Sequence, residues 1–150
     1  MRRADVAGAL LGIDLGTTEA RAGLFGPAGE RLGLGSGGYP TDRDGDGRAE
    51  QDPRDWWAAV AAAVRVALTE ARDRSGRDVI PAAICAVGQG PTLTLLDAAG
   101  EPVRPAITWQ DRRIGDGGFG LLPRIAWLGR TEPEALARSR WFLSASGSVR

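Results

Sequence analysis

The residues best suited to chemistry form one short stretch near the start of the chain, Asp14-Leu15-Gly16-Thr17-Thr18. Gly16 would let the backbone bend close to a bound group, and Thr17 and Thr18 offer backbone N–H and hydroxyl donors to phosphate oxygens. Asp14 could hold Mg²⁺, which proteins usually bind through one or two carboxylates plus phosphate. The stretch therefore predicts a metal and phosphate site. The alternative is an ordinary hairpin turn whose threonines satisfy their own backbone.

A second group of functional side chains lies late in the chain, in the run Trp109-Gln110-Asp111-Arg112-Arg113. An indole packs against the apolar face of a sugar ring, while an amide and a carboxylate exchange hydrogen bonds with sugar hydroxyls. The run therefore favours a carbohydrate contact. It is also compatible with a salt-bridge cluster on the surface, so both interpretations stay open.

Strands and helices must position these groups. Short apolar runs at residues 10–13 and 22–25 predict a β-hairpin whose turn contains the first stretch, and residues 30–39 predict a third strand. The other predicted elements are a buried strand over 80–87, strands over 93–96 and 103–108 around a turn at 97–100, and helices over 121–128 and 132–142. A Gly-rich connector is predicted at 115–120, and a Ser-rich segment without a closing element at 143–150.

The strongest helix signal begins at Asp52, which can cap a helix whose first position is Pro53. Apolar residues then recur at helical spacing, and Gly76 can end the helix. Trp56 and Trp57 lie on this apolar stripe, so both are expected to be anchors in the core.

Two motifs match known ligand sites by their letters alone. Residues 33–38 read Gly-Leu-Gly-Ser-Gly-Gly, as in a dinucleotide-binding loop, but no helix begins there, so a Rossmann site is rejected. Residues 42–47 imitate the start of an EF-hand calcium loop. The twelfth position, which should be a glutamate, is Pro53, so a solvated, flexible connector is predicted instead.

The composition narrows the functional class. The 150 residues are 43% hydrophobic and 25% charged, with 19 acidic and 19 basic residues, and the zero net charge predicts no nucleic-acid or membrane partner. There is no histidine or lysine, which excludes Ser-His-Asp catalysis, His-ligated metals and a P-loop lysine. Cys85 is expected to be buried and reduced. No apolar run approaches the ~20 residues of a membrane span, so a cytoplasmic protein is predicted.

Taken in order, several stretches resemble the N-terminal part of the FGGY carbohydrate kinases, the family of xylulokinase and glycerol kinase. The resemblance covers nearly the whole chain. The residues that carry it are Gly12 to Thr18 with Arg21, Glu50-Gln51-Asp52-Pro53 with Trp56-Trp57, Gly88-Gln89 before Leu95-Leu96-Asp97 and Gly100, Arg104-Pro105-Ala106-Ile107 with Trp109, Asp111 and Arg113, and, further on, Leu121 to Leu128, Glu132-Pro133-Glu134 and Arg140-Trp141-Phe142-Leu143.

The resemblance implies an α/β fold of the actin-like ATPase (ribonuclease H-like) type, with a mixed sheet, an antiparallel hairpin start and flanking helices. It implies transfer of the ATP γ-phosphoryl group to a sugar or polyol hydroxyl, with ATP and Mg²⁺ as cofactors. The implied metal-supporting residue is Asp14, and the implied residues on the ATP phosphates are Gly16, Thr17, Thr18 and Arg21. The implied substrate-binding residues are Gln89, Gly90, Pro91, Thr92, Trp109 and Asp111.

The chain departs from the family in two ways. Glycerol kinases carry Arg-Glu, and xylulokinases Met-His, where this chain has Gly90-Pro91, so neither substrate is carried over. The resemblance also implies a catalytic base aspartate and an adenine-binding C-terminal domain in a region that follows residue 150. Residues 1–150 are thus expected to be an incomplete N-terminal domain, inactive alone, completed by that domain or by self-association. The alternative is a non-catalytic truncated actin-like module that acts by binding a partner.

Overall fold

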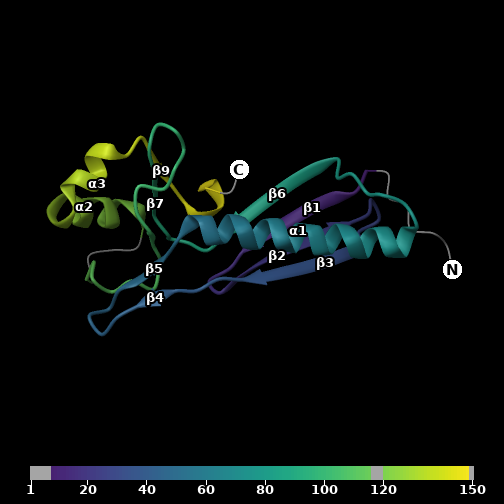
Figure 1. Cartoon of the computed structure of the whole chain (residues 1–150), viewed down its shortest axis with the longest axis horizontal. Coiled ribbons are helices and arrows are strands. Elements are labelled where there is room, and N and C mark those ends of the chain that lie inside the picture. Colours follow the sequence, from purple (N-terminus) through teal and green to yellow (C-terminus); the bar gives the residue numbers. More distant parts are fainter. Residues whose placement is uncertain (1–7, 116–119, 149–150) are drawn as a thin grey trace. The chain divides into compact units, whose positions relative to one another are not determined.

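The computed structural model describes residues 8–115 and 120–148 of the chain. Their contacts divide the chain into two compact units, each treated separately below. The first consists of Met1–Tyr39 and Trp56–Val87, and the second of Pro40–Asp55 and Gly88–Arg150 (Figure 1).

A four-stranded sheet forms the centre of the first unit. Its strands are β1 (Leu10–Leu15), β2 (Glu19–Phe25), β3 (Arg31–Gly38) and β6 (Ala83–Gly88), in the order β3-β2-β1-β6. The pairs β1–β2 and β2–β3 are antiparallel. Strand β6 is hydrogen-bonded to β1 in this sheet, which includes parallel as well as antiparallel strands, and Ala82 N, just before β6, donates to Ala9 O at 2.7 Å. The predicted mixed sheet with an antiparallel hairpin start is confirmed.

Helix α1 (Pro53–Ser75) begins and ends where its capping residues predict. Asp52 Oδ1 accepts a hydrogen bond from Arg54 N at 2.9 Å, and Pro53 occupies the first helical position. At the other end Gly76 adopts a φ of 74° and donates from its N–H to Arg72 O at 2.7 Å, which satisfies one of the last carbonyls.

Three glycines in β3 allow α1 to lie directly against the sheet. A Cβ atom on Gly33 would lie 2.0 Å from Ala67 O, one on Gly35 would lie 2.1 Å from Ala63 O, and one on Gly37 would lie 2.9 Å from Ala59 O. The facing helix residues are also small and are buried. The glycines of the dinucleotide-like motif therefore permit close helix–strand packing, and no helix starts there, which confirms the rejection of a Rossmann site.

Replacing Gly35 by alanine is expected to destabilise the protein by about 2 kcal/mol, because the new methyl group collides with backbone that cannot move without displacing α1. Gly12→Ala is a matched control in the same sheet, since its Cβ would lie 3.9 Å from Gly23 O, an ordinary contact. Urea unfolding followed by circular dichroism measures both. Equal midpoints for the two variants would contradict the packing argument.

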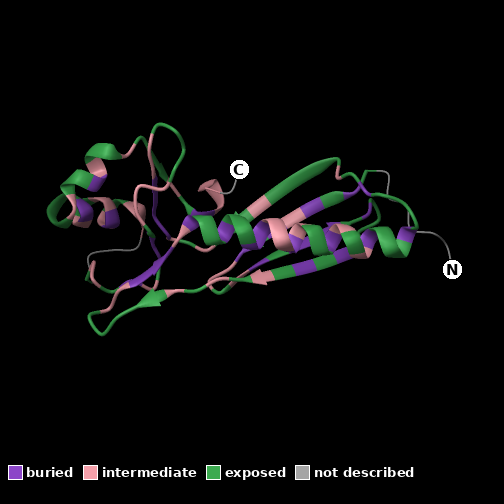
Figure 2. Ribbon diagram, in the orientation of Figure 1, coloured by how far each residue is buried: buried purple, intermediate pink, exposed green. Residues whose placement is uncertain are grey.

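Two predictions about burial were wrong. Strand β6 was expected to be buried, but five of its six residues are exposed and the sixth is half-buried, and Cys85 within it is an exposed free thiol. Figure 2 shows β6 largely in the exposed colour. The strand lies at the edge of the sheet, and in the part of this unit that the structure describes no element packs over it. Trp56 is fully buried as predicted, but Trp57 is 56% exposed.

The second unit contains two small sheets and two short helices. One sheet has the order β4-β5-β8, and the other pairs β7 with β9. The bounds are β4 (Asp42–Arg43), β5 (Ala49–Gln51), β7 (Thr94–Leu96), β8 (Ala106–Ile107), α2 (Leu121–Thr131), α3 (Pro133–Arg138), β9 (Trp141–Leu143) and a terminal 3-10 turn, η1 (Ala145–Ser148). Their core is formed by Leu93, Leu95, Ile107 and Leu128.

The end of the chain differs from the prediction. The helix expected over 132–142 ends at Arg138, and Trp141–Leu143 forms a strand antiparallel to β7. Arg140 N donates to Leu96 O at 2.7 Å, so pairing with β7 outweighs any helical preference. Residues 143–150 were expected to lack a closing element, but η1 buries Ala145 completely. Most of the predicted Gly-rich connector, residues 116–119, lies outside the described residues. Among the described helices, none combines the length and apolar character needed to cross a membrane.

Candidate functional site

The β1–β2 turn has a defined hydrogen-bonded geometry. Gly16 N donates to Glu19 O at 3.0 Å, and the Tyr39 hydroxyl donates to Gly16 O. Tyr39 N donates to Thr18 O at 3.2 Å. A Cβ on Gly16 would lie only 3.1 Å from Glu19 O, so the turn favours glycine. The predicted hairpin turn is therefore present, and it is fastened to the segment after β3 through Tyr39.

Asp14 presents an exposed carboxylate one residue before the end of β1. It lies opposite Arg21 in the hairpin register, yet within residues 8–115 and 120–148 it belongs to no ion pair. The Arg21 guanidinium instead pairs with Glu19, with Nε 2.9 Å from Oε1. This hydrogen bond, together with the charges of Glu19 and Asp14, raises the pKa of Arg21. Asp14 thus remains available to a cation, whereas the exposed Arg21 guanidinium already has Glu19 as an ionic partner.

The pKa of Tyr39 depends on burial and on the charges of this turn. Burial raises the pKa of Tyr39 to about 12, and the negative charges of Asp14 and Glu19 add to the effect. Tyr39 is the only tyrosine in the chain, so its ionisation can be followed by ultraviolet absorbance without interference.

We expect the absorbance of the Tyr39 phenolate to appear with a midpoint near pH 12 in the folded protein and near pH 10 in denaturant. Because the folded-state pKa is the higher one, the contribution of Tyr39 to stability is complete below pH 10 and is lost as the pH rises toward 12. Circular dichroism at each pH identifies the folded range. A midpoint near pH 10 in folded protein would contradict the burial of the phenol.

Gln89 belongs to a chain of side-chain hydrogen bonds in the second unit. Its Nε2 donates to Gln51 Oε1 at 2.7 Å, and Gln51 Nε2 donates to Thr41 Oγ1 at 2.7 Å. Gln89 Oε1 is buried and has no hydrogen-bond partner among the residues described. Of the three predicted substrate residues that follow, Gly90 is exposed, Pro91 is half-buried and Thr92 is fully buried.

Asp111 is the centre of a buried network of charged side chains. Its Oδ2 accepts hydrogen bonds from Ala49 N at 3.0 Å and from Arg113 Nη2 at 2.6 Å, and its side chain is fully buried. Arg113 also donates to Glu50, which accepts a further hydrogen bond from Arg104. The salt-bridge cluster of the alternative is therefore present, with both carboxylates buried and the Arg113 side chain 21% exposed. Asp111 fixes the position of the backbone around Trp109.

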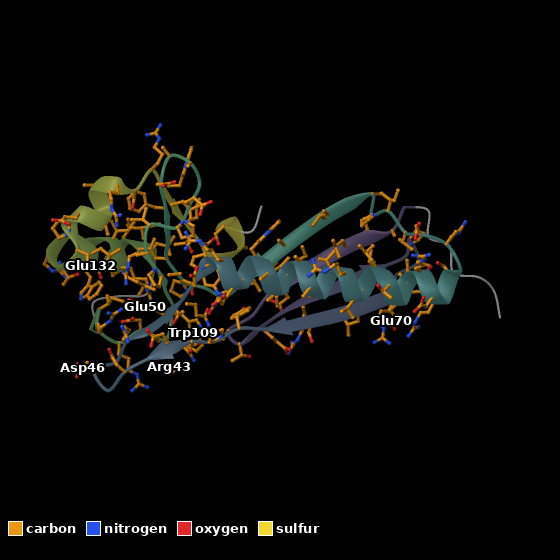
Figure 3. The ribbon with its side chains drawn as sticks, viewed as in Figure 1. Arg43, Asp46, Glu50, Glu70, Trp109 and Glu132 are labelled. Carbon is orange, nitrogen blue, oxygen red and sulfur yellow. The ribbon has the colours of Figure 1, made fainter. Side chains whose placement is uncertain are left out.

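The Arg113 guanidinium connects the network to α2. Burial lowers the pKa of Arg113, but the hydrogen bonds and charges of Asp111 and Glu50 outweigh burial and raise it. Its Cζ also lies 4.8 Å from the ring centre of Trp127, a cation–π contact. Figure 3 labels Glu50 and Glu132, the two carboxylates that Arg104 contacts.

Trp109, the predicted sugar contact, is 46% exposed and lines a polar groove of about 500 Å³. Residues of the β4–β5 hairpin form its other wall. These residues were predicted to form a flexible connector, but they form a short hairpin in which Asp44 Oδ1 accepts from Asp46 N and Arg48 N, each at 3.0 Å. The sequence analysis did not identify this wall, nor the roles of Glu50 and Arg104, although both residues were among those that carried the resemblance.

Comparison with known proteins finds a match to the N-terminal domain model of the FGGY family of carbohydrate kinases over residues 9–116. The chain is 38% identical over 109 residues to a glycerol kinase of Chelativorans sp. (strain BNC1), covering 72% of this chain and 21% of that protein. It is 32% identical over 155 residues to a xylulose kinase of Streptomyces rubiginosus, covering 87% of this chain and 30% of that protein.

Solved structures share the fold. A xyloylose kinase from Brucella ovis superposes with a TM-score of 0.84 at 28% identity, covering 95% of this chain and 33% of that one. The glycerol kinase of Plasmodium falciparum, at 18% identity and a TM-score of 0.75, supports the fold alone. The predicted actin-like ATPase fold is confirmed. The chain spans about a fifth to a third of the length of these relatives.

Proposed function

We propose that this chain, which belongs to the FGGY family of carbohydrate kinases, takes part in the ATP-dependent phosphorylation of a sugar or polyol. In this proposal the β1–β2 turn receives the phosphates of ATP, and residues around Trp109 receive the carbohydrate. The observation that carries the proposal is the exposed, unpaired carboxylate of Asp14 beside the glycine turn, within the stretch that matches the family model.

The residues of the turn fit Mg²⁺ and phosphate. No group of three or more His, Cys, Asp or Glu side chains capable of holding a metal occurs among the described residues. Mg²⁺ commonly takes one or two carboxylates and completes its ligands with phosphate oxygens and water. Asp14 would support the metal, and Gly16, Thr17 and Thr18 would provide the backbone and hydroxyl donors. When bound, Mg²⁺ neutralises charge that develops on the transferred phosphoryl group.

The chain's own residues contribute positioning. Tyr39 holds the carbonyl of Gly16, which fixes the conformation of the turn. Asp111 and Arg113 hydrogen-bond each other, and Asp111 accepts from Ala49 N, which ties the segment after Trp109 to β5. Phosphoryl transfer depends mainly on such positioning and on charge stabilisation, since the protein performs little covalent chemistry.

The substrate class is a small polyhydroxylated molecule. The relatives named glycerol kinase and xylulose kinase support this class, but Gly90-Pro91 lacks the side-chain donors that those enzymes carry there by resemblance. We therefore propose a sugar or polyol distinct from glycerol and xylulose, with Gln89, Trp109 and Asp111 contacting or bracing it.

Titration calorimetry with ATP, ADP and AMP, each with and without Mg²⁺, tests the phosphate half of the proposal. We expect ATP to bind more tightly than AMP, and only in the presence of Mg²⁺, because the proposed contacts are to the terminal phosphates. A coupled ADP-release assay with a panel of sugars and polyols accompanies it, and we expect no turnover from residues 1–150 alone. Equal affinity for the three nucleotides, or no binding, would refute the phosphate site.

The exposed apolar surface of the first unit favours a second candidate, a module that binds a partner without catalysis. Phe25, Leu34 and Val87 are between 39% and 56% exposed and line one apolar hollow on the sheet. Exposed apolar side chains gathered on one sheet are typical of a surface that another element covers. Nucleotide binding in the calorimetric test distinguishes the two, because this candidate requires none.

A further inference from the structure

We propose that the groove beside Trp109 binds a carbohydrate that carries an oxyanion, a carboxylate or a phosphate, through Arg43 and Arg112. The inference deepens the proposed function, on which it rests in taking Trp109 as the carbohydrate contact. The ligand would then make ionic contacts through its oxyanion, in addition to the hydroxyl contacts that the family resemblance implies.

The groove contains more arginine side chains than acidic side chains. Three arginines line it, Arg43, Arg48 and Arg112, with Asp44 as the only acidic lining residue among those described. Arg48 is neutralised, because its Nε lies 3.2 Å from Asp44 and its Nη2 lies 3.1 Å from Asp42. The pKa of Asp44 is held below its usual value, mainly by the hydrogen bond from Arg48 N, so this carboxylate is ionised at neutral pH.

Arg43 and Arg112 keep their charges uncompensated. The Nη2 of Arg43 donates to the neutral amide oxygen of Gln110, and no acidic side chain pairs with Arg43 in residues 8–115 and 120–148. Arg112 is exposed, and within the same ranges its guanidinium makes no ion pair. Both arginines line the same groove, and arginine binds carboxylates and phosphates through paired, charge-assisted hydrogen bonds.

The groove is held in shape by its backbone. Arg112 N donates to Gly47 O at 2.9 Å, and Thr108 N donates to Ala49 O at 3.1 Å, so the hairpin and the 109–112 segment form one surface. Gly47 adopts a φ of 93°, and a Cβ there would lie 3.1 Å from Arg112 Cβ. The site therefore exists before a ligand arrives, which lowers the entropic cost of binding.

Trp109 determines what kind of anion the groove favours. Its indole is half-exposed on the same surface as the two guanidiniums, and Figure 3 labels it together with Arg43. An indole face adds apolar contact to the C–H groups of a sugar or polyol chain, which a small inorganic anion does not possess. A ligand with a polyhydroxylated carbon chain and one terminal oxyanion satisfies both features.

Calorimetry on the whole chain, without nucleotide, tests the proposal with matched ligands. The probes are D-gluconate, D-glucitol 6-phosphate, neutral D-glucitol and acetate. We expect gluconate or glucitol 6-phosphate to bind about tenfold or more tightly than glucitol, with an affinity that falls as NaCl is raised. The tighter of the two identifies the oxyanion. Acetate should bind weakly, because it cannot contact the indole.

Matched variants locate the site. Arg112→Gln is expected to lower the affinity for the anionic ligand about fivefold. The double variant Arg43→Gln/Arg112→Gln should bind the anionic ligand no more tightly than it binds glucitol. Arg130→Gln removes an exposed charge from α2, outside the groove, and should change nothing. Trp109→Ala should lower the affinity for gluconate to that for acetate. Trp57→Ala, which removes an exposed indole in the other unit, should leave the affinity for gluconate unchanged.

The proposal is overturned if glucitol binds the unmodified chain as tightly as both anionic ligands, if acetate binds as tightly as the tighter of the two anionic ligands, or if Arg130→Gln lowers the affinity as much as Arg112→Gln. The comparison of ligands on the unmodified chain requires no variant to fold. Its outcome is also independent of the kinase proposal: anionic polyol binding without ATP binding would refute the phosphate site and keep the groove.

Discussion

In the complete kinase that we propose, replacing Asp14 by asparagine is expected to lower kcat by about a hundredfold or more. The change keeps the size of the side chain and removes its charge. Among the residues that the structure describes, Asp14 belongs to no ion pair, and it lies exposed beside the Gly16 turn, so its loss should affect the fold little. If it supports Mg²⁺, charge stabilisation of about 3 kcal/mol disappears where the transition state needs it.

Two measurements accompany this variant. Binding of ATP to residues 1–150 should lose its dependence on Mg²⁺, while the affinity for carbohydrate should stay unchanged. Asp97→Asn is the matched control, because Asp97 Oδ1 accepts hydrogen bonds from Ala99 N and Glu101 N, each at 2.9 Å, which an amide oxygen can also accept. Near-normal kcat for Asp14→Asn at saturating Mg²⁺ and ATP would mean that the turn is an ordinary hairpin turn.

Replacing Glu50 by alanine is expected to destabilise the protein by about 3–5 kcal/mol. The Glu50 side chain is 7% exposed and accepts hydrogen bonds from both Arg104 and Arg113. Without it Arg104, whose side chain is 9% exposed, keeps only Glu132 as an ionic partner at 3.3 Å. Removing one carboxylate from a buried network leaves a buried guanidinium charge without full compensation. The loss of folding free energy is therefore much larger than for an exposed ion pair.

Chemical unfolding in urea measures this effect, with Glu101→Gln as the control. Glu101 pairs with Arg54 at 3.2 Å, but both side chains are more than half exposed, so the loss should stay within about 1 kcal/mol. Glu50→Gln, which keeps an acceptor oxygen, should fall between the two. A cost for Glu50→Ala as small as that for Glu101→Gln would show that water reaches the network in solution.

The sequence predicted those features whose causes are short-range. The β1–β2 hairpin follows from two apolar runs around a glycine turn, and the limits of α1 follow from Asp52, Pro53 and Gly76. Each signal lies within a few residues of the structure it produces. The same locality allowed the dinucleotide-like glycines to be rejected, since no helix signal follows them.

Burial could not be predicted in the same way, because it depends on which other element covers a residue. The apolar composition of residues 80–87 suggested a buried strand, but β6 is an edge strand left uncovered in the described part of its unit, and Cys85 is exposed with it. Trp57 carried the same apolar signal as Trp56, yet only Trp56 faces the sheet side of α1. Likewise, Trp141–Leu143 becomes a strand because β7 offers it a hydrogen-bonded edge.

The sequence by itself thus determined the family, the starting hairpin with the residues of its turn, the long helix and the Trp109 segment of the groove. Only the tertiary structure decided that Asp111 is buried against Arg113 and that Trp109 shares a groove with Arg43 and Arg112. Asp111 accepts a hydrogen bond from Ala49 N, 62 residues away, and Arg43 donates one to Gln110, 67 residues away, and no local signal connects either pair. Their surroundings arise when the β4–β5 hairpin pairs with β8, since long-range strand pairing places side chains together that no short stretch of sequence can connect.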